Sequence, residues 1–162
     1  MNLTVFGATG GIGREIVRQA LDAGHRVTAG VRDPARLGVT GDSLEVFRAD
    51  LSDPDRLRAA VAGRDAVLSG LGPRTRKDAG VTTRLTRNVL HAMEAELARS
   101  DTDWTSVRPP RLQDKPLTGH YRTVVGGSPR AGRFIARADV AHAMLSMIDD
   151  AGTVGQGVGA AH

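Results

Sequence analysis

Residues 3–15 read Leu-Thr-Val-Phe-Gly-Ala-Thr-Gly-Gly-Ile-Gly-Arg-Glu, and this stretch decides the fold. A short apolar segment runs directly into a glycine-rich turn that opens a helix. Gly7 permits a tight turn, Gly10 lets the backbone approach a phosphate, and Gly13 lets the helix pack closely on the strand. The unpaired N–H groups and the positive dipole end of such a helix attract an anion. The stretch therefore predicts a site for the pyrophosphate of a dinucleotide.

The residues after this turn complete a βαβ unit. Gly24 stands where a helix would end, and residues 25–31 resume a strand. Between Gly10 and Gly24, apolar side chains recur at helical spacing: Ile12, Ile16, Val17, Ala20 and Leu21. A glycine triplet alone also occurs in ordinary turns. The flanking elements favour the dinucleotide site over that alternative.

Two aspartate–proline pairs signal further helices. Asp33-Pro34 and Asp53-Pro54 each place a capping side chain before a proline at the first helical position, so short helices are expected there. Strands are expected over residues 44–49 and 66–71. Right-handed crossovers between parallel strands then give the strand order 3-2-1-4, with the ligand at the carboxyl edge.

This alternation predicts the fold class α/β: a Rossmann-like, doubly wound parallel sheet in three α/β/α layers, forming a single domain over residues 1–162. The rest of the chain continues with strands and helices. In order, we expect a helix over 81–99, a strand over 103–108 in which Trp104 packs, a loop from Pro109 through Gly119, strands over 121–125 and 133–135, a helix over 138–148 and a strand near Val158.

The composition narrows the function classes. The formal net charge is +4, and the basic side chains are arginines except for Lys77 and Lys115. Because the arginines are dispersed and only five aromatic side chains could stack on bases, an anionic small ligand is favoured over a nucleic acid. The chain has no cysteine, so disulfides and thiolate metal sites are excluded. No metal site and no membrane contact are expected, and we expect a cytoplasmic monomer.

The residues after the second strand indicate which dinucleotide would bind. An acidic residue at this position accepts from the ribose 2′-hydroxyl of NAD, whereas this chain has Arg32. A guanidinium there favours a 2′-phosphate, and Arg36 can join it one helical turn later. Asp33 is better explained as a helix cap than as a ribose ligand. NADP(H) is therefore the expected cofactor, with a surface role for Arg32 as the alternative.

Several segments together resemble a known family. The chain is similar to the atypical short-chain dehydrogenase/reductases in five places. These are the runs VFGATGGIG and VRDPARL, the Ala49-Asp50 step, Gly70-Leu-Gly72, and the segment PPRLQDKPLTGHY from Pro109 to Tyr121. Within them, the chain resembles the NAD(P)H-binding, NmrA-like branch that contains flavin reductase. The resemblance covers nearly the whole chain and implies hydride transfer from NADPH to a small planar acceptor such as a flavin, a quinone or a linear tetrapyrrole.

The resemblance also implies which residues matter. Cofactor contacts are expected along the carboxyl edge of the sheet, and Gly70 ends the fourth strand on the nicotinamide side. Carried over by position, Thr9, Gly10, Gly11 and Ile12 would hold the phosphates, Arg32 and Arg36 the 2′-phosphate, Asp50 and Leu51 the adenine, and Leu71 and Gly72 the nicotinamide ribose, while Pro109, Pro110 and Arg111 would line the acceptor side.

Two departures from the family pattern leave alternatives open. Tyr121 is the only tyrosine and Val125 stands four residues later, so the Tyr-x-x-x-Lys proton donor of classical members cannot form, and no catalytic residue is assigned. In addition, about fifty residues of the family pattern, including a serine-bearing strand, have no counterpart near residues 95–96. Either the protein is shortened, or a segment is absent between Ala95 and Glu96. A non-catalytic, NADP(H)-sensing regulator is the alternative function.

Overall fold

The structure is a computed structural model, which describes residues 1–49, 51–72, 88 and 103–162. The chain divides into two compact units, Met1–Asp101 and Thr102–His162. Within the described residues, no helix combines the length and the apolar character needed to cross a membrane.

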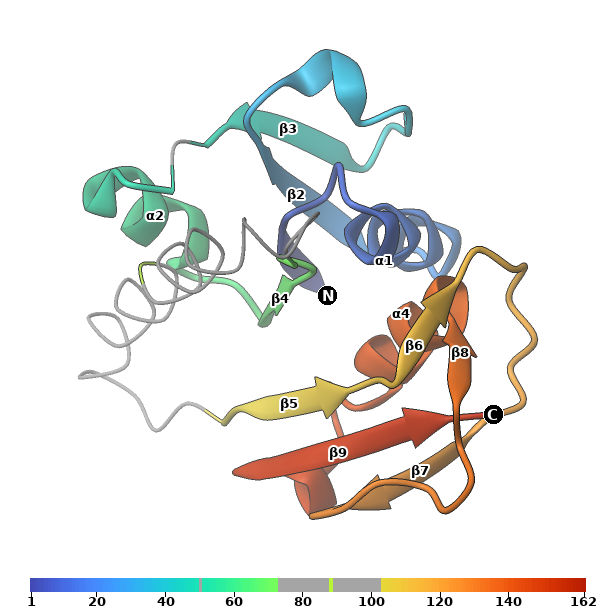
Figure 1. The fold of residues 1–162 in the computed structure, drawn as a ribbon. Helices are drawn as coiled ribbons and strands as arrows, with labels where there is room; N and C mark the ends of the chain where they lie inside the picture. Colours follow the sequence, from blue (N-terminus) through green and yellow to red (C-terminus); the bar gives the residue numbers. More distant parts are fainter. Residues whose placement is uncertain (50, 73–87, 89–102) are drawn as a thin grey trace. The chain divides into compact units, whose positions relative to one another are not determined.

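The first unit contains the βαβ pattern (Figure 1). Its four-stranded sheet has the order β3-β2-β1-β4, and each neighbouring pair is parallel, which confirms the expected strand order. Along the chain the elements are β1 (Asn2–Phe6), α1 (Gly11–Asp22), β2 (Arg26–Val31), the 3₁₀ helix η1 (Pro34–Arg36), β3 (Leu44–Arg48), α2 (Pro54–Val61) and β4 (Ala66–Ser69).

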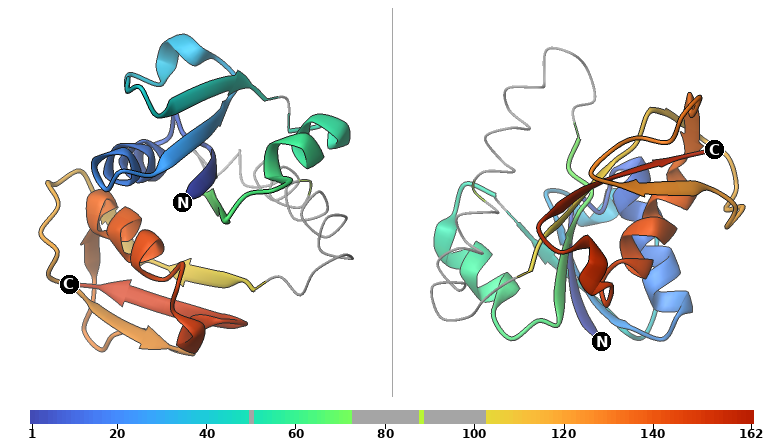
Figure 2. Two further views of the ribbon diagram at one scale, coloured as in Figure 1. Left: turned by 180° about the vertical axis from the view of Figure 1, so that it is seen from behind. Right: turned by 90° about the horizontal axis from the view of Figure 1, so that it is seen from below.

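Both faces of this sheet are covered by helices (Figure 2). Successive side chains of a strand point to opposite faces, so Leu3 and Val5 lie on one face of β1 and Thr4 and Phe6 on the other. On the latter face, Thr4 donates a hydrogen bond of 2.7 Å to the carbonyl oxygen of Ala60 in α2. Phe6 packs there in a buried cluster with Ala49, Leu51, Leu57, Ala60 and Val61. The result is the predicted α/β layer arrangement.

The second unit contains two small sheets and one described α-helix. In one sheet β9 lies between β5, to which it is parallel, and β7, to which it is antiparallel. In the other sheet β6 and β8 are parallel. The elements are β5 (Thr105–Arg108), β6 (Arg111–Gln113), β7 (Arg122–Val125), β8 (Phe134–Ala136), α4 (Arg137–Ser146), η3 (Ala151–Thr153) and β9 (Gln156–Ala161).

Three sequence-based expectations need correction. The segment after Pro109 was expected to be a loop through Gly119, but it contains β6, whose three residues pair with β8. Three residues are too few to show a strand period in the sequence. Trp104 was expected to pack within a strand, but it precedes β5 and is 56% exposed. The helix at Pro34 is a single 3₁₀ turn.

The proposed seam between Ala95 and Glu96, like the helix expected over 81–99, lies outside the described residues. The strands on either side of this region are β4 and β5. Within the described part of the chain, β4 pairs only with β1, and β5 pairs only with β9. Each is thus an edge strand of its own sheet. The missing segment and the single domain over 1–162 stay predictions.

Candidate dinucleotide-binding site

Three glycines bring the ends of β1 and β4 and the start of α1 into backbone contact. Gly7 has a φ of 71°, and a Cβ atom there would lie 2.9 Å from the carbonyl carbon of Gly70. A Cβ on Gly13 would overlap the carbonyl oxygen of Gly7, and one on Gly70 would lie 2.7 Å from the Cα of Gly13. We call Gly7, Gly13 and Gly70 the glycine corner. The turn and packing roles expected of Gly7 and Gly13 agree with this geometry.

The first turn of α1 presents backbone donors and no acceptor of its own. The N-cap residue, Gly10, has no side chain to cap the helix, and the first turn contains no acidic residue. The first helical hydrogen bond joins the N–H of Arg14 to the carbonyl oxygen of Gly10 at 2.9 Å. The N–H groups of Gly11, Ile12 and Gly13 precede that bond, so no helical carbonyl accepts from them. This arrangement favours an anion.

The residues expected to hold the phosphates line this turn. Gly11 is exposed, whereas Thr9, Gly10 and Ile12 are half-buried. Gly10 donates to the carbonyl oxygen of Gly7 at 2.9 Å, which closes the turn. A Cβ on Gly10 would lie 3.1 Å from that oxygen. A larger side chain would therefore both crowd the turn and cover the donors.

The carboxyl end of β2 carries positive charge. Arg32 follows the last strand residue, Val31, and Arg36 ends η1; both arginines are exposed. Neither forms an ion pair with a described residue. The Asp33 side chain accepts from the N–H of Ala35 at 3.2 Å, which confirms the prediction that it caps the helix. The Asp33 carboxylate therefore accepts a hydrogen bond from the backbone of its own helix, as a capping residue does.

The ends of β3 and β4 lie closer to the core than the sequence suggested. Asp50 lies outside the described residues, and the Leu51 side chain, 7% exposed, belongs to the buried cluster with Phe6. Leu71 is half-buried against the same cluster, whereas Gly72 is exposed. The adenine and nicotinamide contacts assigned to these residues stay predictions.

The residues expected on the acceptor side belong to the second unit. Pro109 and Pro110 are half-buried and lead into β6, which begins with Arg111. Arg111 and Phe134 are register partners in the β6–β8 pair, and the guanidinium lies 6.0 Å from the centre of the phenyl ring. Phe134 is 39% exposed. The pair places positive charge beside a partly exposed aromatic ring.

Sequence reasoning missed a buried carboxylate in the second unit. Asp139, in the first turn of α4, is fully buried, and its Oδ1 atom accepts from the N–H groups of Thr118 and Gly119, each at 2.9 Å. The Thr118 hydroxyl and the His162 ring also contact it, at 3.0 and 2.9 Å. Burial alone would raise the pKa of Asp139, but these hydrogen bonds together lower it.

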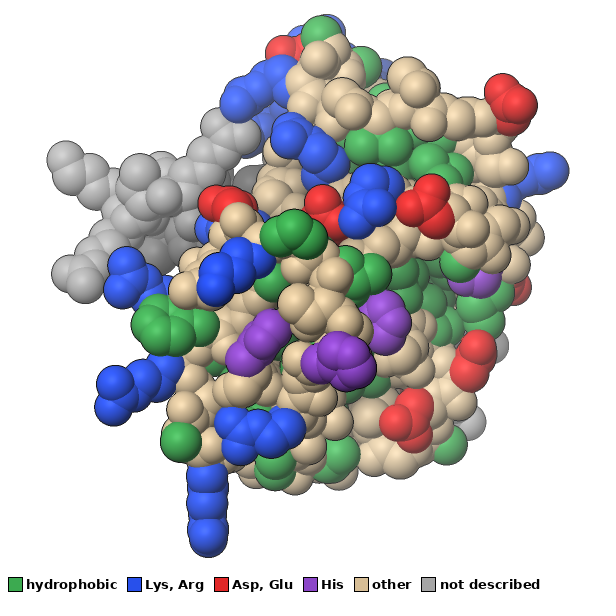
Figure 3. Space-filling model, turned by 90° about the vertical axis from the view of Figure 1, so that its right-hand side faces the viewer, with side chains coloured by type: hydrophobic (Ala, Val, Ile, Leu, Met, Phe, Trp, Pro, Cys, Tyr) green, Lys and Arg blue, Asp and Glu red, His purple; other side chains and the backbone are tan. Residues whose placement is uncertain are grey.

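A tyrosine–histidine pair lies in the same unit. The Tyr121 hydroxyl is 2.6 Å from Nδ1 of His142, and histidine side chains gather on the face seen in Figure 3. Burial and the charge of Asp139 raise the pKa of Tyr121, while a hydrogen bond with Ser146 lowers it to a smaller degree. Among the described residues, no group of three or more histidine or acidic side chains could hold a metal ion.

Comparisons with known proteins agree with this geometry. The model of the NAD(P)H-binding family matches residues 7–99 and again residues 91–151. Photosystem II assembly factor Ycf39 of Cyanophora paradoxa is 35% identical over 82 residues, which are 50% of this chain. That match covers 26% of the Ycf39 sequence, so the chain spans about a quarter of that relative's length.

Solved structures share the fold. A Rossmann-fold NAD(P)-binding family protein of Shigella flexneri superimposes with a TM-score of 0.79 and 21% identity, covering 98% of this chain and 92% of that one. A candidate NADH-flavin reductase of Streptococcus pneumoniae TIGR4 gives a TM-score of 0.74 and 19% identity, with 100% and 99% coverage. Identities this low show the fold alone. The family match includes the glycine corner and most of both units, and the chain therefore belongs to the NAD(P)H-binding family.

Proposed function

We propose that the protein is an NADPH-dependent oxidoreductase that transfers a hydride to a planar acceptor such as a flavin, a quinone or a linear tetrapyrrole. One observation carries the cofactor assignment. The first turn of α1 has backbone donors without a capping side chain, and the two arginines that follow β2 have no carboxylate partner among the described residues. Both features complement the phosphates of NADPH.

The acceptor class follows from the chemistry that such a site needs. Bound NADPH would supply a hydride with its electron pair, the acceptor would take it up, and water could supply the accompanying proton. The transfer then depends mainly on stacking the two rings at the right distance. Arg111 and the ring of Phe134 combine a positive charge with an aromatic face, which suits an anionic planar molecule. The resemblance over residues 109–121 supports the same class.

A non-catalytic NADP(H) sensor is the second candidate. The chain's single tyrosine, Tyr121, is hydrogen-bonded to His142, and position 125 holds an exposed valine. The proton donor of classical short-chain dehydrogenases is therefore missing. This observation favours a protein that binds the nucleotide without turning it over.

Binding and turnover measured together separate the two candidates. Calorimetry would give the affinities for NADPH and NADH, and absorbance would follow NADPH oxidation with FMN or menadione. An oxidoreductase binds NADPH and consumes it only when an acceptor is present. A sensor binds NADPH equally well and consumes none. Failure to bind either dinucleotide would contradict both candidates.

The preference for NADPH is tested by Arg32→Ala. Removing one charge-assisted pair with a phosphate costs about 1.5–3 kcal/mol, which corresponds to about tenfold or more in the Kd for NADPH. The affinity for NADH should hardly change. Arg26→Ala is the matched control, because it removes an exposed arginine at the opposite end of β2 from Arg32. Equal losses for both dinucleotides would contradict the assignment.

We also propose that a segment is absent near residues 95–96. The two family matches overlap over residues 91–99, the region where the family pattern is interrupted. Intact mass spectrometry on protein from its natural source tests this directly. A mass well above 17.1 kDa supports an additional segment, and a mass of 17.1 kDa contradicts it.

A further inference from the structure

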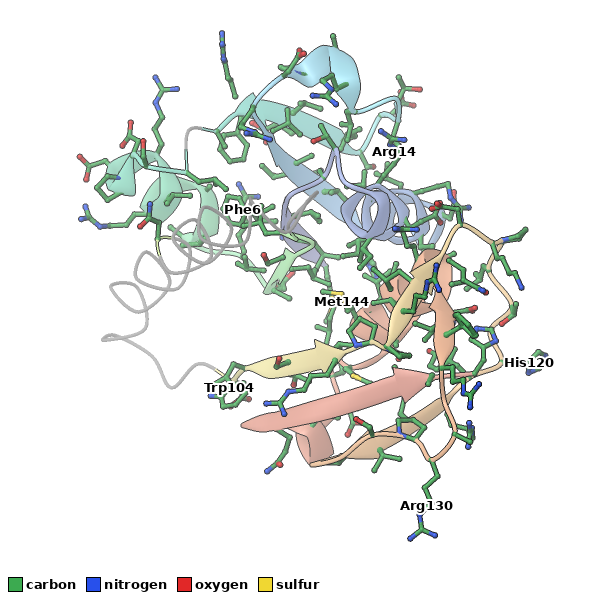
Figure 4. All side chains as sticks on the ribbon, in the orientation of Figure 1. Phe6, Arg14, Trp104, His120, Arg130 and Met144 are labelled. Carbon is green, nitrogen blue, oxygen red and sulfur yellow. The ribbon has the colours of Figure 1, made fainter. Side chains whose placement is uncertain are left out.

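Arg14 connects the phosphate turn to the segment that follows β2. It is the fourth residue of α1, directly after Gly13. Its Nη2 atom lies 3.2 Å from the carbonyl oxygen of Arg36 and 3.4 Å from that of Thr9. Figure 4 labels Arg14 and shows its side chain extending from α1 on the side of η1. One guanidinium thus reaches both halves of the expected nucleotide site.

The charge around Arg14 differs from that around the next arginine of the same helix. Arg18, one turn later, forms ion pairs with Glu15 and Asp22 at 2.6 and 3.4 Å. Arg14 donates to two carbonyl oxygens, and among the described residues it has no carboxylate partner. Arg14, Arg32 and Arg36 all lack a carboxylate partner within the described part of the chain. A dianionic ligand would supply a counterion.

The donors of Arg14 suit a phosphate monoester. A guanidinium carries five N–H donors, and the two carbonyl contacts both use Nη2, so the remaining nitrogens keep their capacity. The contact with Arg36 fixes the guanidinium beside the 3₁₀ turn, where the end of β2 presents its positive charge. A phosphate on the ribose 2′-oxygen is the feature that distinguishes NADPH from NADH.

From this arrangement we propose that Arg14 is a third cationic ligand of the 2′-phosphate of NADP(H), beside Arg32 and Arg36, and that it helps to determine the preference for NADPH over NADH. This proposal rests on the proposed cofactor function of the site. It assigns Arg14 a direct contact with the phosphate in addition to its contact with the backbone of Arg36.

Two substitutions separate the charge of Arg14 from its support of the backbone. Arg14→Gln keeps an N–H donor on a shorter side chain but removes the positive charge. Arg14→Met keeps the apolar stem and removes both. Arg18→Gln is the matched control, because it removes an arginine charge one turn away on the same helix. Thermal unfolding would establish that each variant remains folded.

Isothermal titration with NADPH, NADH, adenosine 2′,5′-bisphosphate and adenosine 5′-monophosphate gives the readout. We expect Arg14→Gln and Arg14→Met to weaken NADPH and the bisphosphate about tenfold, and to change NADH and the monophosphate by less than about twofold. The salt dependence of NADPH binding should also become shallower in both variants. Arg18→Gln should leave all four affinities close to those of the wild type.

Three outcomes would overturn the proposal. Unchanged NADPH affinity in both variants excludes a contact with the phosphate. Affinity retained in Arg14→Gln but lost in Arg14→Met assigns Arg14 to backbone support alone. Equal losses for NADPH and NADH place the contact on a part that the two dinucleotides share. Failure of the proposed cofactor function is seen separately, because the wild type would then bind neither dinucleotide.

Discussion

The helices α1 and α4 begin without a capping side chain, yet the two helix starts differ in where their negative charge comes from. At α1 the cap is Gly10, and the first turn has no acidic residue. At α4 the cap is Ala136, and the first turn supplies the buried carboxylate of Asp139. The chain therefore provides the anion at α4 itself, whereas the first turn of α1 contains no negative charge of its own.

The comparison separates a binding site from a structural one. Asp139 is charged and fully buried, but donors of Thr118, Gly119 and His162 occupy its oxygens. Such a carboxylate holds its own unit together and has little capacity left for a ligand. The start of α1 contains no charged side chain in contact with the phosphate turn except Arg14, and its backbone donors have no helical partners. Unused donors, rather than a buried charge, mark the candidate site.

The largest expected effect is that of Gly13→Ala. A Cβ atom at Gly13 would overlap the carbonyl oxygen of Gly7, and it would approach other backbone atoms of the same turn. Since backbone must move, we expect a loss of at least about 1–3 kcal/mol in the free energy of unfolding. Circular dichroism during thermal unfolding would measure it.

Gly41→Ala is the control for that substitution. A Cβ atom at Gly41 would make only ordinary contacts with Leu21, the closest at 3.5 Å. Its unfolding midpoint should equal or exceed that of the wild type, because alanine restricts the unfolded chain. If Gly13→Ala were as stable as Gly41→Ala, this result would contradict the close backbone packing described for the glycine corner.

The next effect concerns binding at the same turn. In Gly10→Val the side chain would cover the donors of α1, so we expect NADPH and NADH affinity to fall at least about a hundredfold, or about 2.7 kcal/mol. Gly10→Ala should lose less, because a Cβ atom alone would lie 3.1 Å from the oxygen of Gly7. Calorimetry on folded protein measures both. Retained affinity in Gly10→Val would show that this turn is not the phosphate site.

The sequence predicted both helix starts, that of α4 to within one residue, but not the buried carboxylate at α4, and the reason is physical. The β1–α1 turn is local: its glycines, cap and helix lie within one short stretch, and each role follows from backbone geometry. The Asp139 contacts join residues about twenty positions apart, and no periodicity indicates them. The three-residue strand β6 and the exposed Trp104 likewise depend on partners that are distant in the sequence.

At the start of α4, Asp139→Ala and Asp139→Asn test how the carboxylate acts. Alanine leaves the N–H donors of Thr118 and Gly119 without their acceptor, which should cost about 1–2 kcal/mol of stability in total, because both residues are exposed and water can reach them. Asparagine keeps one carbonyl oxygen for these donors, so its loss near neutral pH should be smaller. Chemical unfolding measures both variants. An alanine variant as stable as the wild type would show that the cluster does not hold the unit together.

The pH dependence gives the charge contribution of Asp139. Its pKa is lowered in the folded state from the usual 3.8. The resulting stability is therefore fully present above that value and is lost as the pH falls through the lower, folded-state pKa. Between pH about 5 and about 2, the wild type should lose more stability than Asp139→Asn. Parallel acid curves for the two proteins would contradict a lowered pKa.

The smallest expected effect is that of the Asp139 charge on the pKa of Tyr121. Because the chain has one tyrosine, an absorbance titration reports this hydroxyl alone. Burial is the larger cause that raises its pKa, the charge of Asp139 adds to it, and the hydrogen bond with Ser146 opposes both. We therefore expect ionisation above pH 10.0 in the folded protein and at about 10 in denaturant.

Two variants distinguish these causes. Asp139→Asn should shift the Tyr121 titration to lower pH, because a negative charge that disfavours the phenolate is gone. Ser146→Ala should shift it to higher pH, because a hydrogen bond that favours the phenolate is lost.

The effect of Tyr121 on stability has the opposite pH dependence to that of Asp139. The raised pKa stabilises the fold below the unfolded-state value, and this contribution is lost as the pH rises through the folded-state pKa. Ionisation of the folded wild type at or below its usual pH would contradict the burial of Tyr121 beside Asp139. It would also contradict an electrostatic interaction between Asp139, at the start of α4, and the Tyr121 hydroxyl, which pairs with His142.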